Sequence, residues 1–235
     1  MTTLLLKLDR QKQARLLKIV THAGALLPLA VLFYDFWYYR LGADPVREAI
    51  LRTGKPALIL LLLSLTITPL TSVAGWKQLQ PLRRPLGLYA FLYVCVHLAI
   101  FVGVDYELNL RLILDGIVNN PYVLVGFTAF LLLIPLAATS TKASMRRLGK
   151  NWKRLHKLVY LVGILAIWHF LWLVKDNGEA LIYAGILAFL FLLRFQPVRQ
   201  LLIRWRRSLQ NRRQRPAART PASQLTSVPA KTEPQ

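Results

Sequence analysis

The sequence predicts an all-α integral membrane protein, a six-helix transmembrane bundle with both termini in the cytoplasm. Of the 235 residues 55% are hydrophobic, and they form long unbroken runs such as PALILLLLSLTITPL rather than periodic stripes. A helix needs about 20 apolar residues in succession to cross the hydrocarbon core of a membrane. Between these runs, basic segments alternate with mixed or acidic ones, which is typical of a chain that crosses a membrane repeatedly.

We expect six spans, because only helices and closed barrels satisfy backbone polar groups in lipid, and long runs without alternation are helical. In chain order the spans are residues 19–39, 56–74, 85–104, 120–139, 154–174 and 180–195. A basic amphipathic segment precedes the first run and no small-residue cleavage site follows it, so we interpret this run as a retained span rather than a cleaved signal. No internal repeat is apparent in the sequence.

The charged residues predict the orientation of the chain. Lysine and arginine are concentrated before the first span, in the second-to-third and fourth-to-fifth connections, and after the sixth span, whereas the other three connections carry Asp or Glu. The positive-inside rule therefore places both termini in the cytoplasm. The net charge of +21 is explained by topology and does not indicate nucleic-acid binding. We expect a basic cytoplasmic segment at 1–18, the six-span domain at 19–197, and a basic, largely disordered cytoplasmic tail at 198–235.

Two histidines are the first candidates for chemistry, because an ionisable residue inside a span suggests a functional site. His97 lies thirteen residues after Arg84, and His169 lies twelve after Lys157. Both spans start at the cytoplasm, so a rise of about 1.5 Å per residue places each ring about 18–20 Å deep. Imidazoles at one depth on neighbouring helices can ligate a haem iron from both sides, leaving it no open position, so that it carries electrons. An interhelical hydrogen bond is the alternative role for each ring.

His156 lies near the cytoplasmic surface, about 20 Å from His169 along the helix axis. At about 100° per residue, the thirteen-residue interval also leaves the two rings about 140° apart around the helix. Positions 83 and 84, where a partner for His156 would stand on the third span, are both arginine. His22 has no partner at its depth, and we interpret it as structural.

Three segments together resemble the MsrQ (YedZ) family of haem-binding membrane subunits, within the ferric-reductase-like transmembrane superfamily. They are RRPLGLYAFLYVCVHLAIF, the TPL that closes the second span, and KRLHKLVYLVGILAIWHF. The resemblance covers about residues 20–197. It implies haem b bound by His97, His169 and His156, a bound FMN, and residence in the bacterial inner membrane. It also implies a non-catalytic subunit that delivers electrons to a periplasmic molybdopterin-containing catalytic subunit, which reduces methionine sulfoxide in oxidised envelope proteins.

The sequence shows no GxGxxG, phosphate loop or soluble flavin domain that could supply electrons. We expect a cytoplasmic flavin reductase or the quinol pool to supply electrons. The hydrocarbon core of the membrane is about 30 Å thick, so one haem in its outer half cannot carry electrons across it alone. A flavin near the cytoplasmic face would shorten the distance that the electrons must cross. Arg83 and Arg84 open the haem-bearing helix and are candidates to bind an FMN phosphate or a haem propionate. Arg146 and Arg147 lie at the same face. Whether the chain holds one haem or two stays open.

Two other functions remain as alternatives. The chain could be a self-contained quinol-oxidising cytochrome b or metal reductase of the same architecture. It could also be a transporter or assembly scaffold with structural histidines, although the lack of acidic residues deep in the spans argues against a proton-coupled carrier. The single cysteine, Cys95, excludes a disulfide framework and a CxxC site.

Overall fold

The computed structural model describes residues 2–174 and 178–214, and every regular element in them is helical. In chain order the helices are α1 (Thr2–Trp37), α2 (Pro45–Pro69), α3 (Arg83–Ile100), α4 (Leu110–Asn119), α5 (Pro121–Ala138), α6 (Lys142–Leu148), α7 (Lys150–Leu155), α8 (Leu158–Leu173), α9 (Gly178–Leu192) and α10 (Gln196–Gln214). Two π-helical turns, η1 (Leu70–Ala74) and η3 (Phe101–Asp105), extend α2 and α3, and a 3₁₀ helix, η2 (Lys77–Leu82), leads into α3. The predicted all-α class is confirmed for the described residues.

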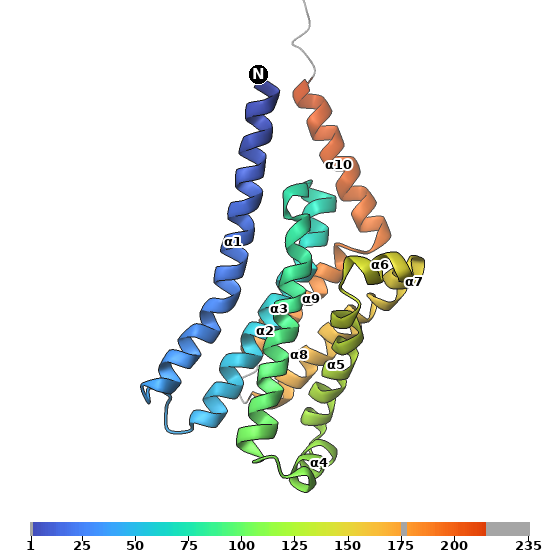
Figure 1. Ribbon diagram of the computed structural model, residues 1–235. Helices are drawn as coiled ribbons and strands as arrows, with labels where there is room; N and C mark the ends of the chain where they lie inside the picture. The colour runs from blue at the N-terminus through green and yellow to red at the C-terminus, as the bar shows by residue number, and fades with distance from the viewer. Residues whose placement is uncertain (1, 175–177, 215–235) are drawn as a thin grey trace, which may run out of the picture.

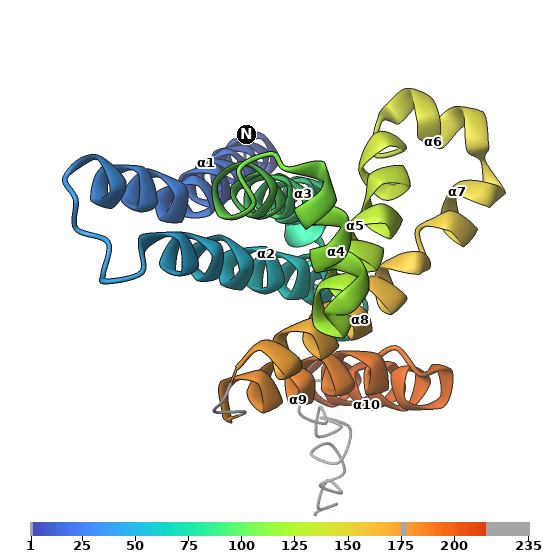
Figure 2. The same cartoon turned by 90° about the horizontal axis from the view of Figure 1, so that it is seen from below.

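The long helices lie side by side as a bundle (Figures 1 and 2). At its centre α2 packs mainly against α3, and α5 mainly against α8, so the centre consists of two antiparallel helix pairs. Helix α1 lies against α2 and α3, and α9 lies against α2 and α8. We call α2–α3 the first hairpin and α5–α8 the second hairpin.

Helix α2 is the most central element because it is buried on two faces. One face packs Leu60 and Leu61 against Tyr93 of α3, Leu133 of α5 and Val162 of α8. The other face packs against α8 and α9 in a second apolar cluster. Lipid tails are as apolar as leucine, so close van der Waals packing rather than removal from water holds these helices together.

Local sequence signals explain where several helices begin. Asp44 caps α2 by accepting the backbone N–H of Arg47 at 3.0 Å, and Pro45 occupies the first helical position, where its missing N–H costs nothing. Asn109 caps α4 through the N–H groups of the next turn. Pro121 starts α5 in the same way as Pro45 starts α2.

Tyr93 joins α1 to α3 through the backbone of α1. Its hydroxyl donates to the carbonyl oxygen of Ala25 at 2.8 Å and accepts the N–H of Leu29 at 3.1 Å. In a regular helix Leu29 would donate directly to Ala25, so the tyrosine is inserted into one hydrogen bond of α1, next to Pro28. The side chain of Tyr93 is completely buried. Its two hydrogen bonds therefore connect α1 to α3 at a point that water does not reach.

The predicted spans agree with the structure for five of the six. Five described helical segments are long and apolar enough to cross a membrane, namely 12–37, 45–74, 77–105, 121–138 and 150–173. The sixth predicted span falls on α9, whose 15 residues cover only about 22 Å. It reaches spanning length only together with α10, from which it is bent by 74°.

The structure differs from the prediction in three places. The first part of the tail, which we expect to be largely disordered, forms α10 as far as Gln214, and residues 215–235 lie outside the described part. Spacing inside apolar runs could not reveal α4, α6 and α7, which are short helices in the connections. Helix α1 also includes the basic N-terminal segment, from Thr2 onward.

The two ends of the bundle differ in charge. The N-terminus of α1, the η1–η2 turn, α6, α7 and α10 lie at one end (Figure 1), which we call the arginine end. The α1–α2 connection, α4 and the start of α9 lie at the other, the carboxylate end. Apart from Asp9, every carboxylate in the described residues belongs to the carboxylate end: Asp35, Asp44, Glu48, Asp105, Glu107, Asp115 and Glu179.

Candidate functional site

The structure brings His97 of α3 and His169 of α8 together, as the depth argument predicts. Their ring centroids are 6.3 Å apart and the ring planes are nearly perpendicular, at 89°. One histidine comes from each hairpin. The pair therefore exists only where the two hairpins pack against each other.

Both imidazoles are held by a backbone carbonyl through Nδ1. His97 Nδ1 lies 3.0 Å from the carbonyl oxygen of Ile50, and His169 Nδ1 lies 2.7 Å from that of Tyr122. A carbonyl oxygen only accepts, so Nδ1 carries the proton and Nε2 of each neutral ring keeps its lone pair. Metal-binding histidines are usually oriented in this way, with the second nitrogen donating to a carbonyl or carboxylate.

A glycine makes room for each ring. Gly54 and Gly126 stand one helical turn after the carbonyls of Ile50 and Tyr122. A Cβ on Gly126 would lie 2.7 Å from Nδ1 of His169, and a Cβ on Gly54 would lie 3.2 Å from Cε1 of His97. A side chain at Gly126 would force the imidazole of His169 to move, and one at Gly54 would crowd the imidazole of His97.

The two hairpins use the same arrangement at the same spacing. Each histidine follows its carbonyl partner by 47 residues, and the two glycines, like the two histidines, stand 72 positions apart in the chain. The two hairpins share this geometry and these two residue types but no extended sequence motif, so no repeat is apparent in the sequence. At this spacing His156 of the second hairpin corresponds to Arg84 of the first, so the first hairpin offers no histidine opposite it.

A cavity of about 810 Å³ surrounds the histidine pair. Its walls are apolar side chains of α2, α3, α5 and α8, and its polar lining gathers toward the carboxylate end. The polar and charged lining residues are Asp44, Arg47, Lys55, His97, Asp105, Tyr106, Tyr122, His169 and Glu179. The volume lies within the range of about 300–1,000 Å³ that cofactor sites occupy.

The pair fits an axially ligated haem. An iron held by two imidazole nitrogens at about 2 Å each, with ring centres about 1 Å further out, would place those centres about 6 Å apart, close to the separation of His97 and His169. Among the described residues no cluster of three or more His, Cys, Asp or Glu side chains could hold a bare metal ion. Two protein ligands suit a porphyrin, which supplies four nitrogens of its own.

Sequence reasoning missed two cationic residues in this cavity. Arg47 and Lys55 line it near the carboxylate end, where the carboxylates of a haem could pair with them. Lys55 also bridges α2 to α9 through Glu179, at 2.6 Å. Both precede the second predicted span, in a connection that carries charges of both signs, and the sequence analysis named neither of them as a candidate.

Tyr106 lies at the mouth of the same cavity, just beyond the third span. Burial raises the pKa of its hydroxyl, and the neighbouring Asp105 and Asp115 raise it further. The hydroxyl therefore stays protonated at neutral pH and remains a hydrogen-bond donor.

His156 lies away from this pair, between α7 and α8 at the arginine end. Its ring stacks on Trp152 with centroids 3.9 Å apart, and its Nδ1 lies 3.2 Å from the carbonyl oxygen of Trp152. Its Nε2 is buried without a partner in the described structure. The remaining predicted site residues, Arg83 and Arg84, also lie at this end, Arg83 half-buried and Arg84 exposed.

His22 has the structural role that the sequence suggested. Its Nδ1 lies 2.8 Å from the hydroxyl of Tyr89 on α3, and the two rings meet edge to face. It lines neither the large cavity nor the second hollow described next.

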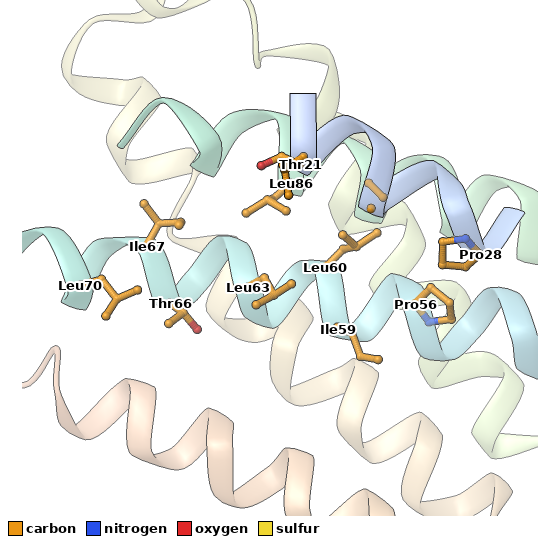
Figure 3. Close-up of a pocket in the computed structure, with 13 residues that line it drawn as sticks. Thr21, Pro28, Pro56, Ile59, Leu60, Leu63, Thr66, Ile67, Leu70 and Leu86 are labelled. Atoms are coloured by element: carbon orange, nitrogen blue, oxygen red, sulfur yellow. The ribbon is translucent and has the colours of Figure 1, made fainter. Parts of the chain in front are cut away.

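A second hollow of about 430 Å³ lies between α1 and α2. Figure 3 shows Pro28 of α1 opposite Pro56 of α2, with aliphatic side chains along the groove. Its only polar side chains, Thr21 and Thr66, donate their hydroxyls to their own helices. None of its lining residues can exchange a proton at neutral pH.

Comparisons with known proteins agree with this geometry. Residues 53–167 match the family described as ferric reductase like transmembrane component. Over 180 residues the chain is 51% identical to the protein-methionine-sulfoxide reductase heme-binding subunit MsrQ of Xanthomonas campestris pv. campestris (strain 8004), which covers 74% of this chain and 83% of that relative. The MsrQ proteins of Xanthomonas axonopodis pv. citri (strain 306) and Xanthomonas oryzae pv. oryzae (strain MAFF 311018) are 51% and 50% identical over the same shares.

The chain belongs to the MsrQ family. The resemblance predicted from the three sequence segments is thereby confirmed, and the ferric-reductase-like match runs from Thr53 in α2 to Ile167 in α8. MsrQ membership and the five or six candidate spans confirm a multi-pass protein of the bacterial inner membrane. No solved structure matches the chain.

Proposed function

We propose that this MsrQ-family chain is a haem b electron-transfer subunit that serves a periplasmic methionine sulfoxide reductase. The observation that carries the proposal is the pair His97–His169, because both Nδ1 atoms are engaged by carbonyls and both Nε2 atoms are left as ligands. A haem held on both sides supplies one-electron transfer and no site for oxygen.

The chain's own residues would divide the work of binding. His97 and His169 orient the ligand nitrogens, Gly54 and Gly126 keep the rings against their carbonyls, and the apolar walls exclude water. Arg47 and Lys55 would bind the haem carboxylates at the carboxylate end. This places the negative groups near water, where their desolvation costs less.

The carboxylate end would face the periplasm and the arginine end the cytoplasm. The distribution of lysine, arginine and carboxylates supports this orientation, as does the position of the N-terminus of α1 and of α10 at the same end (Figure 1). Electrons would leave beside the mouth of the large cavity, toward a molybdopterin-containing catalytic subunit. As a carrier, the chain would contribute no catalytic residue to sulfoxide reduction.

At the arginine end we propose an FMN site that includes His156, Arg83 and Arg84. Unpartnered buried donors at this end support a phosphate-bearing ligand there. A second bis-histidine haem is less well supported, because Arg84 stands where the partner of His156 would be. The donor would be a cytoplasmic flavin reductase or quinol.

The alternative function is a self-contained quinol-oxidising cytochrome b. Oxidation of a quinol releases protons, so its site needs a residue that accepts them. The α1–α2 groove is apolar enough for an isoprenoid tail, but no residue that lines it is such an acceptor. Reduction of the purified protein by a quinol analogue alone would favour this alternative, and reduction only by NAD(P)H with a flavin reductase would favour the proposed function.

The test of the haem site uses three single variants. His97→Ala and His169→Ala should each lose at least about 90% of the reducible low-spin b-type spectrum, because one imidazole cannot complete the axial pair. His22→Ala is the matched control and should keep the wild-type haem content. Haem and flavin quantitation per polypeptide accompanies the spectra, and full spectra in both cavity variants would refute the assignment.

A further inference from the structure

Arg194, between α9 and α10, turns its side chain into the arginine end. Its Nη2 donates to the carbonyl oxygen of Leu65 in α2, and its guanidinium lies over the ring of Tyr160, with Cζ 5.0 Å from the centroid. The carbonyl of Leu65 is available because the residue four positions later is Pro69, which has no N–H to donate. The carbonyl that Pro69 leaves free in α2 thus fixes the place of Arg194, which follows Leu65 by 129 residues.

The other two nitrogens of this guanidinium have no hydrogen-bond partner among the described residues. Nε and Nη1 of Arg194 are buried and unpaired in the described structure, and so are Oγ1 of Thr68 and Nε2 of His156. These four atoms are all of the buried side-chain nitrogens and oxygens that lack a partner in the described residues. Buried polar side-chain atoms normally have a partner, so unpartnered atoms of Arg194, Thr68 and His156 at the same end of the bundle point to a ligand.

The surroundings of Arg194 are positive. Arg83 is near enough for its charge to act on both Arg194 and His156. Among the described carboxylates all but Asp9 belong to the carboxylate end, at the other end of the bundle. Apart from Asp9, no carboxylate of the described residues lies at this end to neutralise the two arginines, and an anionic ligand would supply that counter-charge.

We infer that Arg194 anchors the phosphate group of the flavin at the arginine end, with Arg83 as a second cation. The inference rests on the FMN of the proposed function and adds the residue that makes the site prefer FMN over a flavin without a phosphate group. A guanidinium presents parallel N–H groups that match two oxygens of a phosphate. The hydroxyl of Thr68 stands as a further donor, and the ring of His156, stacked on Trp152, borders the same region. A phospholipid headgroup presents the same phosphate chemistry, and the experiment separates the two sources.

The experiment compares FMN with riboflavin, which lacks the phosphate. Kd values are measured by quenching of flavin fluorescence on purified haem-loaded protein in three forms: wild type, Arg194→Gln and Arg204→Gln. Arg204 is an exposed arginine of α10 and serves as the matched control. Wild type and Arg204→Gln should bind FMN at least tenfold more tightly than riboflavin. Arg194→Gln should lose this preference, with weaker FMN binding and a riboflavin Kd changed less than twofold.

Haem absorbance per polypeptide reports whether each variant is folded. If Arg194→Gln does not retain haem, Arg194→Lys is used in its place. Lysine keeps the positive charge but lacks the parallel N–H groups of the guanidinium, so this variant should show an intermediate preference for FMN. An unchanged preference in a folded variant, or equal loss of both flavins, would overturn the assignment of Arg194. So would phospholipid phosphate that co-purifies with wild type and is absent from Arg194→Gln while FMN affinity is unchanged. Absence of flavin binding in wild type would instead refute the FMN of the proposed function itself.

Discussion

Gly126 shows how a single hydrogen atom in place of a side chain can define a site. His169 reaches the carbonyl of Tyr122 only across the bare Cα of Gly126. Gly54 does the same for His97, with slightly more space. Neither position is a turn or has a positive φ, so the need for glycine comes from the approach of the imidazole and not from backbone conformation.

Because a Cβ has less space at Gly126 than at Gly54, we predict that alanine at Gly126 weakens haem binding more than alanine at Gly54. Gly126→Ala should reduce haem affinity about tenfold or more, because its methyl group forces the ring of His169 to move, and overpacking costs about 1–3 kcal/mol. Gly54→Ala should have a smaller effect. Gly24→Ala, where a Cβ meets nothing within 4 Å, is the control. The measurement is the rate and extent of haem transfer from each variant to apomyoglobin, and wild-type retention by Gly126→Ala would contradict the role of the glycine.

Residue by residue, depth counting was enough to pair His97 with His169 and to leave His22 and His156 out of the pair. It could not find Gly54, Gly126, Arg47 or Lys55. A glycine in an apolar run gives no sign of what approaches it from another helix. A cation near a span end looks like a topology signal until the neighbouring helices are placed.

At the level of elements, the insertion of Tyr93 into α1 replaces one backbone hydrogen bond by two. Tyr93→Phe should lower the thermal midpoint by about 2–8 °C, since Leu29 and Ala25 lose a buried partner worth about 1 kcal/mol. A thiol-reactive fluorophore can follow the transition, because Cys95, the only cysteine, lies two residues away on the same helix and is half-buried. Tyr39→Phe, at a side chain that is 95% exposed, should leave the midpoint unchanged. Equal midpoints in both variants would mean that α1 closes its own hydrogen bond.

The long helices were predictable because hydrocarbon demands continuous apolar runs, and the observed spans begin and end within a few residues of the predicted ones except where charged connecting segments extend them. The short helices were not. In α4 and α10, apolar and polar residues alternate at helical spacing on a surface, a pattern that the search for unbroken runs passes over. By its composition alone, the segment that forms α10 resembles a polar tail.

For the molecule as a whole, orientation is the main open prediction. In a Cys95→Ala background, Leu110→Cys places an exposed thiol on α4, and Ser208→Cys places one on α10. A membrane-impermeant maleimide should label the α4 thiol in intact spheroplasts and the α10 thiol only after lysis, because the positive-inside rule keeps the arginine end in the cytoplasm. The opposite pattern would invert the path of electrons and exclude a periplasmic acceptor.

The contribution of one histidine by each hairpin also matters for how the chain matures. A ligand that binds two packed halves stabilises their packing by the same free energy with which the packing stabilises the ligand. If His97 and His169 bind haem as proposed, packing of the second hairpin on the first would therefore be coupled to haem supply. The amount of assembled subunit would then follow the haem supply of the cell.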